Sequence, residues 1–323
     1  MFDLITIGDC TWDTFLHIEN ASLTYGKKSH RPEQLCLPYA QKLPIEDMFE
    51  SMGGNAANVA VGVNRLGFST AIVSEIGLDM HSCQIYQELK KNNVNISYLK
   101  RTKNRKTRFS TILNFHGERT ILSYFEKIPY TKLVLPKTKN IFYTSLGHSF
   151  ETQQKKIIHS LKKNPQTRLI CNPGTHQLKE KTKNFAKILR YTDVLFLNKE
   201  EAEILVGPAK NTKQLFQKIH DTGVKIVVIT DGVIGSSASN GENIFSCGIY
   251  HVPIVSKTGA GDAYASAFVS ALLQNCALAE CMLWGTANAA SVTGHLGAQT
   301  GLLTAPQIKK FIKEHPLPQA VFS

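Results

Sequence analysis

Apolar and polar positions along the chain follow two different periods, and these periods predict strands and helices in succession. Short apolar runs such as Phe2–Ile7 and Thr70–Ile76 are typical of buried strands. Segments such as Asn55–Leu66 and Glu151–Lys163 have the composition and spacing of helices, and Gly67 directly after the first of them is a common signal for a helix end. The first part of the chain therefore predicts a core strand, a helix and a second core strand.

Beyond residue 140, strand-like and helix-like segments alternate. The expected strands are Ile141–Thr144, Leu169–Cys171, Val194–Leu197 and Lys225–Ile229, and the expected helices are Glu151–Lys163, Lys199–Val206, Lys213–His220, Ala260–Gln274 and Leu278–Ala290. Such alternation favours a mainly parallel sheet with helices on both faces. The predicted fold class is therefore α/β, with three α/β/α layers in one domain that spans residues 1–323.

A smaller group of strands is predicted outside this central sheet. Thr107–Phe115 and Thr120–Phe125 are strand-like runs on either side of a short polar segment, which is typical of a β-hairpin. The stretch Phe15–Pro44 has no helical period and is interrupted by Pro and Gly, so it predicts a loop or short strands. Together these segments could form a small sheet apart from the core.

Composition sets broad limits on the class of protein. A chain of 323 residues can bury one large core. Its 37 Lys and Arg against 25 Asp and Glu give a formal net charge of +12, which fits either a basic enzyme or a nucleic-acid-binding protein. The basic residues are scattered, which favours the enzyme, and an anionic substrate such as ATP suits a positive field. We therefore expect no nucleic-acid partner.

Cysteine usage and the termini argue for a reduced, cytoplasmic protein. The seven Cys residues are odd in number and form no Cys-x-x-Cys pair, which argues against a disulfide framework and a zinc site. Met1–Leu4 lacks the features of a signal peptide. The uncharged stretch Ala263–Ala279 is shorter than the roughly 20 apolar residues of a membrane span. We expect no membrane partner.

The strongest chemical motif lies between Lys257 and Asp262. The small residues Gly259, Ala260 and Gly261 open an Ala-rich helix, and the free N–H groups at a helix start can bind an anion. A carboxylate at Asp262 would be kept ionised by the helix dipole and could accept a proton from an attacking hydroxyl. The alternative is an ordinary turn in which Asp262 is a cap or a first-turn acid.

A second glycine pair precedes another helix and carries groups that can bind hydroxyls. Gly54 would let a polar ligand approach the backbone, and the amides of Asn55 and Asn58 can both donate and accept hydrogen bonds. Asp13, shortly after the first strand, could also bind sugar hydroxyls. The alternatives are a plain turn with Asn55 as N-cap and Asp13 as a turn acid. The pattern is not Gly-x-Gly-x-x-Gly, so a dinucleotide site gains little support.

Two further motifs follow predicted strands. Asn198 and Glu201 are spaced as in a capping box, or could face a Mg·ATP site through water at the carboxyl end of a strand. Thr230, Gly232 and Gly235 form a Gly-rich turn whose N–H groups could bind phosphate, although a plain β-turn explains them equally well.

Taken together and in this order, these motifs resemble the ribokinase/PfkB family of carbohydrate and nucleoside kinases. Gly53–Leu66 and Lys257–Phe268 match its two signatures, Asn198 and Glu201 match its Asn-x-x-Glu motif, and Thr230–Gly235 matches its nucleotide loop. The resemblance implies a ribokinase-like fold, and it covers nearly the whole chain. It also implies a β-lid, formed by segments near residues 14–50 and 104–126, and an ATP-dependent kinase that phosphorylates an alcohol group.

The resemblance assigns a role to each motif. It implies that Asp262 is the catalytic base and that the backbone of Gly259, Ala260 and Gly261 is the anion hole. The nucleotide and Mg²⁺ would be held by Asn198 and Glu201 (through water, for the metal) and by Thr230, Gly232, Gly235 and Asn288. The hydroxyls of the acceptor would be held by Asp13, Gly54, Asn55 and Asn58.

One departure from the family pattern concerns a monovalent cation. The family usually has Asp where this chain has Ser256, and in several members that Asp helps to hold the cation. We therefore expect activation by K⁺ to be weak or absent.

The substrate and the oligomeric state stay open at this stage. A sugar or sugar phosphate is the expected acceptor, because the Gly-Gly-Asn segment and Asp13 together suit hydroxyl groups. A nucleoside such as adenosine is the second candidate, and a catalytically silent small-molecule-binding protein is a further alternative. Relatives often dimerise through the lid, so we expect a homodimer.

Overall fold

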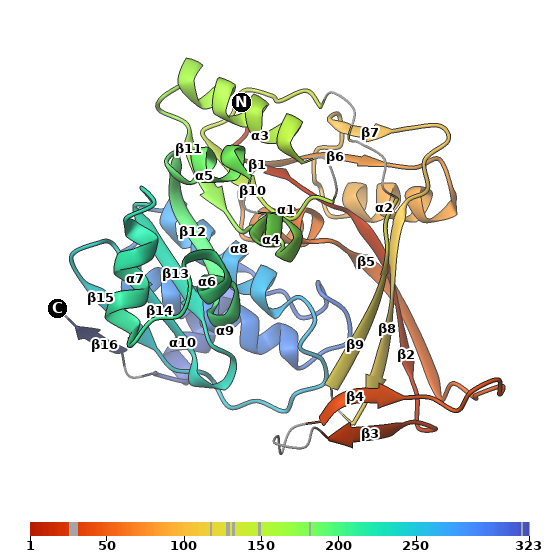
Figure 1. Cartoon of the computed structure of the whole chain (residues 1–323). Helices are drawn as coiled ribbons and strands as arrows, with labels where there is room; N and C mark the ends of the chain where they lie inside the picture. The colour runs from red at the N-terminus through yellow and green to blue at the C-terminus, as the bar shows by residue number, and fades with distance from the viewer. Residues whose placement is uncertain are drawn as a thin grey trace.

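A ten-stranded sheet forms the centre of the computed structural model (Figure 1). The structure describes residues 1–25, 32–116, 118–126, 130, 133–147, 150–180, 182–317 and 319–322. The strand order in the sheet is β16-β15-β14-β13-β12-β11-β10-β1-β6-β7. These strands are β1 (Leu4–Ile7), β6 (Thr70–Ile76), β7 (Leu99–Arg101), β10 (Asn140–Tyr143), β11 (Arg168–Cys171), β12 (Thr192–Asn198), β13 (Ile226–Thr230), β14 (Ser236–Ser239), β15 (Ile244–Cys247) and β16 (Gln319–Phe322).

Most neighbours in this sheet run parallel. Every pair from β7 across to β13 is parallel, and the pairs from β13 to β16 are antiparallel. The predicted mainly parallel sheet is therefore confirmed. Since β1, β10, β11, β12 and β13 all point the same way, their carboxyl ends meet at one edge, where α/β proteins commonly bind ligands.

Helices cover both faces of the sheet. They are α1 (Asn55–Arg65), α2 (Met80–Lys91), α3 (Glu151–Lys163), α4 (Thr175–Glu180), α5 (Lys183–Leu189), α6 (Lys199–Val206), α7 (Thr212–His220), α8 (Ala260–Leu273), α9 (Leu278–Thr293) and α10 (Ala305–Glu314). None of them, within the described ranges, combines the length and apolarity that a bilayer crossing requires.

Alternation along the strands separates two cores. Successive strand side chains point to opposite faces. Ile5 and Ile7 accordingly pack in a cluster with apolar residues of α3, α5, α6 and α7, whereas Leu4 packs with those of α1, α8, α9 and α10. The result is the predicted three-layer α/β/α arrangement.

A second sheet extends away from the main sheet, as Figure 1 shows. It has the order β5-β2-β8-β9 and consists of β2 (Thr11–His17), β5 (Asp47–Gly53), β8 (Arg108–Phe115) and β9 (Glu118–Tyr124). The predicted pairing of the last two strands is confirmed, because Phe109 to Phe115 pair antiparallel with Tyr124 to Glu118. A separate two-stranded pair, β3 (Ser22–Tyr25) and β4 (Pro32–Cys36), lies within the stretch predicted to be loop or short strands.

Helices α1 and α8 approach each other closely because small residues face each other. A Cβ atom added to Gly62 would lie 2.4 Å from Ser266 Oγ, so no larger side chain fits there without movement. The hydroxyl of Ser266 is turned into its own helix, where it donates to the Ala263 carbonyl at 2.9 Å. This packing holds α1 and α8 against each other.

Candidate active site

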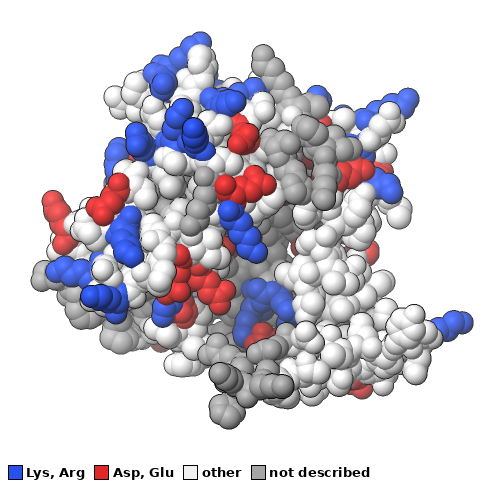
Figure 2. Space-filling view, in the orientation of Figure 1, with Lys and Arg blue, Asp and Glu red and all other residues white. Residues whose placement is uncertain are grey.

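A cavity of about 770 Å³ lies between the carboxyl edge of the main sheet and the second sheet. Figure 2 shows a hollow in this face, with basic and acidic side chains around it. Its main-sheet wall includes residues that end or follow five parallel strands, namely Asp9, Ser145, Asn172, Asn198 and Thr230. Its opposite wall includes residues of the second sheet, namely Thr11, Asp13, Arg108, Phe109, Ser110, Ile112, Arg119, Ile121, Ser123 and Tyr124.

Asp262 lies in the first turn of α8 and faces this cavity. Its side chain is buried, with 8% of the residue exposed, and it accepts a hydrogen bond of 2.8 Å from Asn58 Nδ2. Burial raises the pKa of Asp262 to about 6, although hydrogen bonds from Asn58 and Asn55 oppose the shift, and the charges of Asp13 and Glu201 raise the pKa further. A carboxyl group with such a pKa is mostly ionised at neutral pH and accepts a proton more readily than an ordinary Asp.

The loop before Asp262 depends on two glycines for different reasons. Gly259, the N-cap of α8, has φ of +80°, and a Cβ atom there would lie 2.5 Å from Ala298 Cα. Gly261 lines the cavity, and a Cβ atom there would meet no protein atom within 4 Å. Ala260 is not among the lining residues. Gly259 occupies the N-cap position of α8, so the alternative that Asp262 is the cap is wrong; Asp262 is a first-turn acid that faces the cavity.

Gln299 orients Asn58, the hydrogen-bond partner of Asp262. Gln299 belongs to none of the motifs found in the sequence. Its Nε2 donates to Asn58 Oδ1 at 2.9 Å and to the Met52 carbonyl at 3.3 Å. Because Asn58 Oδ1 accepts this bond, its Nδ2 is the atom left to donate to Asp262. Gln299 lies 241 positions from Asn58 in the sequence, and no local pattern links the two.

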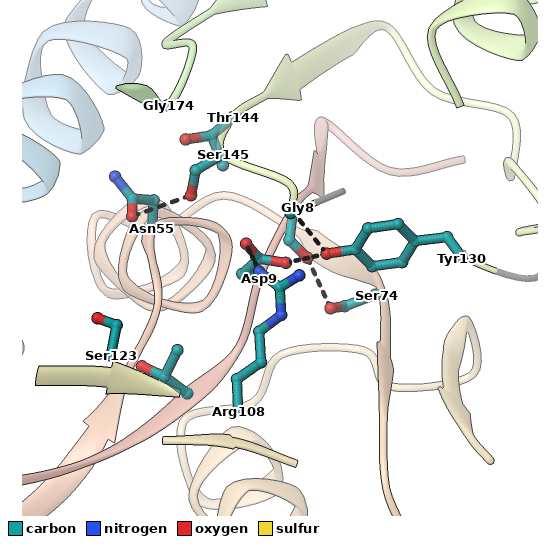
Figure 3. A network of polar contacts seen from close by, with 12 residues as sticks. Gly8, Asp9, Asn55, Ser74, Arg108, Ser123, Tyr130, Thr144, Ser145 and Gly174 are labelled. Atoms are coloured by element: carbon teal, nitrogen blue, oxygen red, sulfur yellow. Dashed lines mark hydrogen bonds and ion pairs between the residues drawn. The ribbon is translucent and has the colours of Figure 1, made fainter. Parts of the chain in front are cut away.

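The residues predicted to hold an acceptor lie together in the cavity. Gly54 has φ of +90°, and a Cβ atom there would lie 2.4 Å from the Asp9 carbonyl oxygen. Asn55 is not the N-cap of α1, because Gly54 occupies that position; instead Asn55 Oδ1 accepts from Ser145 Oγ at 3.2 Å (Figure 3). Asn55, Asn58 and Asp13 all line the cavity.

The carboxylate of Asp13 needs space that only glycine leaves. It accepts from Thr11 Oγ1 at 2.8 Å, and burial raises its pKa. A Cβ atom added to Gly53 would lie 1.9 Å from Asp13 Oδ2. Gly53 and Asp13 lie on the neighbouring strands β5 and β2 of the second sheet. Gly53 therefore keeps the place of the Asp13 carboxylate open.

A buried ion pair joins the two walls of the cavity. Figure 3 shows Arg108 of β8 and Tyr130 converging on Asp9, which follows β1. Arg108 Nη1 donates to Asp9 Oδ2, and the Tyr130 hydroxyl donates to Asp9 Oδ1 at 2.5 Å. The Tyr130 oxygen in turn accepts from the Gly147 N–H at 3.1 Å. Arg108 is thus neutralised and held in place.

Asn198 and Glu201 form a capping box at the start of α6. Asn198 Oδ1 accepts from the Glu201 N–H at 2.8 Å, and Glu201 Oε2 accepts from the Asn198 N–H at 2.9 Å. The capping interpretation is therefore correct, and both residues also line the cavity, where burial raises the pKa of Glu201. The described part of the chain contains no group of three or more His, Cys, Asp or Glu side chains that could together hold a metal ion. One carboxylate nevertheless fits Mg²⁺, which usually keeps several waters and binds phosphates.

The remaining predicted residues are divided. Thr230 lines the cavity, whereas Gly232 and Gly235 do not. Gly232 is the first residue of a short 3₁₀ turn (Gly232–Ile234) between β13 and β14, and Gly235 follows this turn. Asn288 also lies outside it: this fully buried residue donates to the Ala263 carbonyl and accepts from the Leu303 N–H, both at 2.9 Å. In this structure, the amide of Asn288 ties α9 to α8.

Comparisons with known proteins show kinases among the proteins that this chain resembles. The chain is 25% identical over 285 residues to the 5-dehydro-2-deoxygluconokinase of Clostridium perfringens (81% of this chain, 84% of the relative). It is 27% identical over 267 residues to the nucleoside kinase of Methanocaldococcus jannaschii (81% and 86%). Its fold is similar to that of Arabidopsis thaliana ribokinase complexed with ribose and ATP, with a TM-score of 0.77 and 20% identity over 97% of this chain and 99% of the other. The profile of the pfkB family carbohydrate kinases matches residues 31–305, so the chain belongs to this family.

Proposed function

We propose that the protein transfers the terminal phosphoryl group of ATP to a hydroxyl of a sugar or sugar-like molecule. The observation that carries this proposal is Asp262, a buried carboxylate with a raised pKa at a glycine-opened helix start. It shares one cavity with the acceptor candidates Asp13, Asn55 and Asn58. Phosphoryl transfer depends chiefly on alignment and on charge stabilisation, which this arrangement can supply.

In the proposed reaction, Asp262 takes the proton of the acceptor hydroxyl. The hydroxyl oxygen forms a bond to the terminal phosphorus, the bond from that phosphorus to the ADP oxygen breaks, and the proton stays on Asp262. The N–H groups of the Gly259–Gly261 loop would stabilise the charge on the transferring group. The second sheet would act as a lid that excludes water and suppresses hydrolysis of ATP.

The nucleotide side of the cavity would use residues of the main sheet. Thr230 and Asn198 line it at the ends of two neighbouring strands. Glu201 Oε2 is used within the capping box, and its other carboxylate oxygen would hold a water of a Mg²⁺ ion. When bound, Mg²⁺ would neutralise charge on the phosphates.

A sugar is the acceptor that we favour, and a nucleoside is the second candidate. Carboxylate and amide groups, which read hydroxyls, line the cavity at Asp13 and Asn55. A specific observation favours the nucleoside: Phe109 and Tyr124, which stack with ring centroids 5.2 Å apart, also line the cavity and could contact a base.

The test is ATP consumption across a panel of sugars, keto sugars, sugar phosphates and nucleosides. Acceptor-dependent formation of ADP with one class identifies the substrate class. A panel in which no acceptor raises ADP formation above the acceptor-free rate would contradict the proposal and favour a catalytically silent binding protein.

We expect activity to depend on the ionisation of Asp262. A base must be deprotonated, so kcat/KM for the acceptor should be constant above a pH of about 6 and fall about tenfold per pH unit below it. Phosphate groups of the substrates also titrate near this pH. The pH profile of an Asp262→Asn variant, measured on its residual rate, shows how much of the pH dependence comes from those phosphates. A wild-type profile that stays parallel to that of the variant down to pH 4.5 would contradict the role of Asp262.

We also expect little activation by K⁺. Ser256 is buried beside the loop, and its hydroxyl accepts from the Thr258 N–H at 3.2 Å, so this position offers no carboxylate to a cation. Turnover measured in K⁺ and in a bulky organic cation should therefore differ by less than about twofold. A clear rise in K⁺ would reject this expectation.

We further propose that the protein is a cytoplasmic homodimer. Met48 and Leu122 on the second sheet are exposed apolar side chains that a second copy could cover. A monomeric mass in light scattering would contradict the dimer, and secretion of the tagged protein would contradict the compartment.

A further inference from the structure

Lys257, two positions before the Gly259–Gly261 loop, contacts the second sheet across the cavity. Lys257 Nζ donates to Glu118 Oε1 at 2.5 Å, and the two residues lie 139 positions apart in the sequence. Lys257 lines the cavity together with Gly259, Gly261 and Asp262. Glu118 is the first residue of β9. The ion pair therefore links the loop that would receive a phosphate to the sheet on the opposite wall.

Of the basic side chains that line the cavity in the described part of the chain, Lys257 is the one next to the Gly259–Gly261 loop. Among the described residues that line the cavity, the lysines and arginines are Arg108, Arg119 and Lys257. Arg108 is held by Asp9, and Arg119 lies on the second sheet. A transferring phosphoryl group needs positive charge beside it, and lysine supplies this as a compact point charge.

The partner of Lys257 is one that it can release at small cost. The Glu118 side chain is 72% exposed and that of Lys257 is 41% exposed. Exposed ion pairs of this kind contribute little to stability, because water solvates both groups almost as well when they separate. A phosphate placed in the cavity would carry more negative charge than the carboxylate and would be less exposed, so it would compete effectively for the ammonium group.

We infer that Lys257 exchanges partners when ATP occupies the cavity: its ammonium group separates from Glu118 and binds the terminal phosphate. This inference rests on the proposed function only in taking ATP as the nucleotide. Glu118 then acts as an internal competitor of that phosphate. Breaking the Lys257–Glu118 contact at each turnover would also couple the arrival of the nucleotide to the position of the second sheet.

The test compares two nucleotides that differ in the terminal phosphate. Calorimetry with Mg²⁺ would measure binding of the non-hydrolysable analogue AMP-PNP and of ADP to the wild type, Lys257→Met, Glu118→Gln and the double variant. Lys257→Met should weaken AMP-PNP about tenfold and change ADP less than about twofold. Glu118→Gln should tighten AMP-PNP a few-fold, and this gain should vanish in the double variant, because no ammonium group remains to be freed.

Lys225→Met is the matched control. Lys225 also pairs with a carboxylate, Asp193, at 2.7 Å, but it is not among the residues that line the cavity. Lys225→Met removes the same single positive charge as Lys257→Met and should leave the affinities for AMP-PNP and ADP unchanged. The comparison therefore separates a direct contact with the phosphate from an effect of the protein's net charge.

The outcomes distinguish this inference from the proposed function. Equal effects of Lys257→Met on AMP-PNP and ADP, or no effect on either, would overturn the exchange while leaving the kinase proposal intact. A wild type that binds neither nucleotide overturns both. All these substitutions are at exposed side chains, and equal melting temperatures would show that the variants fold.

Discussion

Replacing Asp262 by Asn should lower acceptor-dependent turnover by about 10² to 10⁴-fold, the usual contribution of a general base. The amide has nearly the shape of the carboxyl group but cannot take the proton. Affinity for ATP should change little, because the negative charge that disappears does not attract a phosphate. The measurement is ADP release with the best acceptor of the panel, at pH 8, where the wild-type carboxyl group is ionised.

The stability of this variant provides the control. Burial disfavours the charged form of Asp262, as its raised pKa shows. An Asn at the same place carries no charge and can still hydrogen-bond to Asn58, so the melting temperature at pH 8 should stay the same or rise. Loss of activity with a lower melting temperature would indicate a structural role, and unchanged turnover would remove Asp262 from the mechanism.

Gly261→Ala should lower turnover by about 10²-fold while leaving the fold intact. The added methyl group would meet no protein atom within 4 Å, so it would project into open space at a residue that lines the cavity. It would then occupy part of the place of the transferring phosphoryl group, and losing one contact to such a group typically costs about 10² to 10³ in rate. Alanine also favours the helix that begins here. Steady-state kinetics with a parallel thermal melt would measure both effects.

Gly248→Ala is the matched control for this substitution. A Cβ atom at Gly248 also meets nothing within 4 Å, and Gly248 does not line the cavity. Both variants should therefore fold like the wild type, but only Gly261→Ala should lose activity. Equal activity of the two variants would mean that no ligand approaches the backbone at Gly261.

The sequence predicted the strongly periodic segments well. Thr70–Ile76 and Glu151–Lys163 have the predicted bounds. Helices α4 and α5 were not predicted, because six and seven residues are too few to establish a helical period. Strand β14 was also missed, since three of its four residues are Ser and it lacks an apolar run. Helix α10 did carry a readable signal, a capping box between Thr304 and Gln307, which the prediction overlooked.

Some residues of the candidate site could be found from short motifs, whereas others are brought together from distant parts of the sequence. Asp262, Asn58 and Glu201, which short motifs singled out, all line the cavity. The ion pair between Asp9 and Arg108 and the contact of Gln299 with Asn58 join segments about 100 and 240 positions apart. No periodicity or spacing encodes such pairs, so only the folded chain reveals them.

The close packing of α1 and α8 at Gly62 and Ser266 bears on how this enzyme could acquire new substrates. Asp262, the proposed base, and Asn58, whose amide holds it, sit on these two closely packed helices, whereas much of the opposite wall comes from strands with exposed outer residues. Mutations in those strands could reshape the opening toward other molecules without disturbing Asp262. Directed evolution of a different substrate range should therefore begin in β8 and β9 and leave both helices untouched.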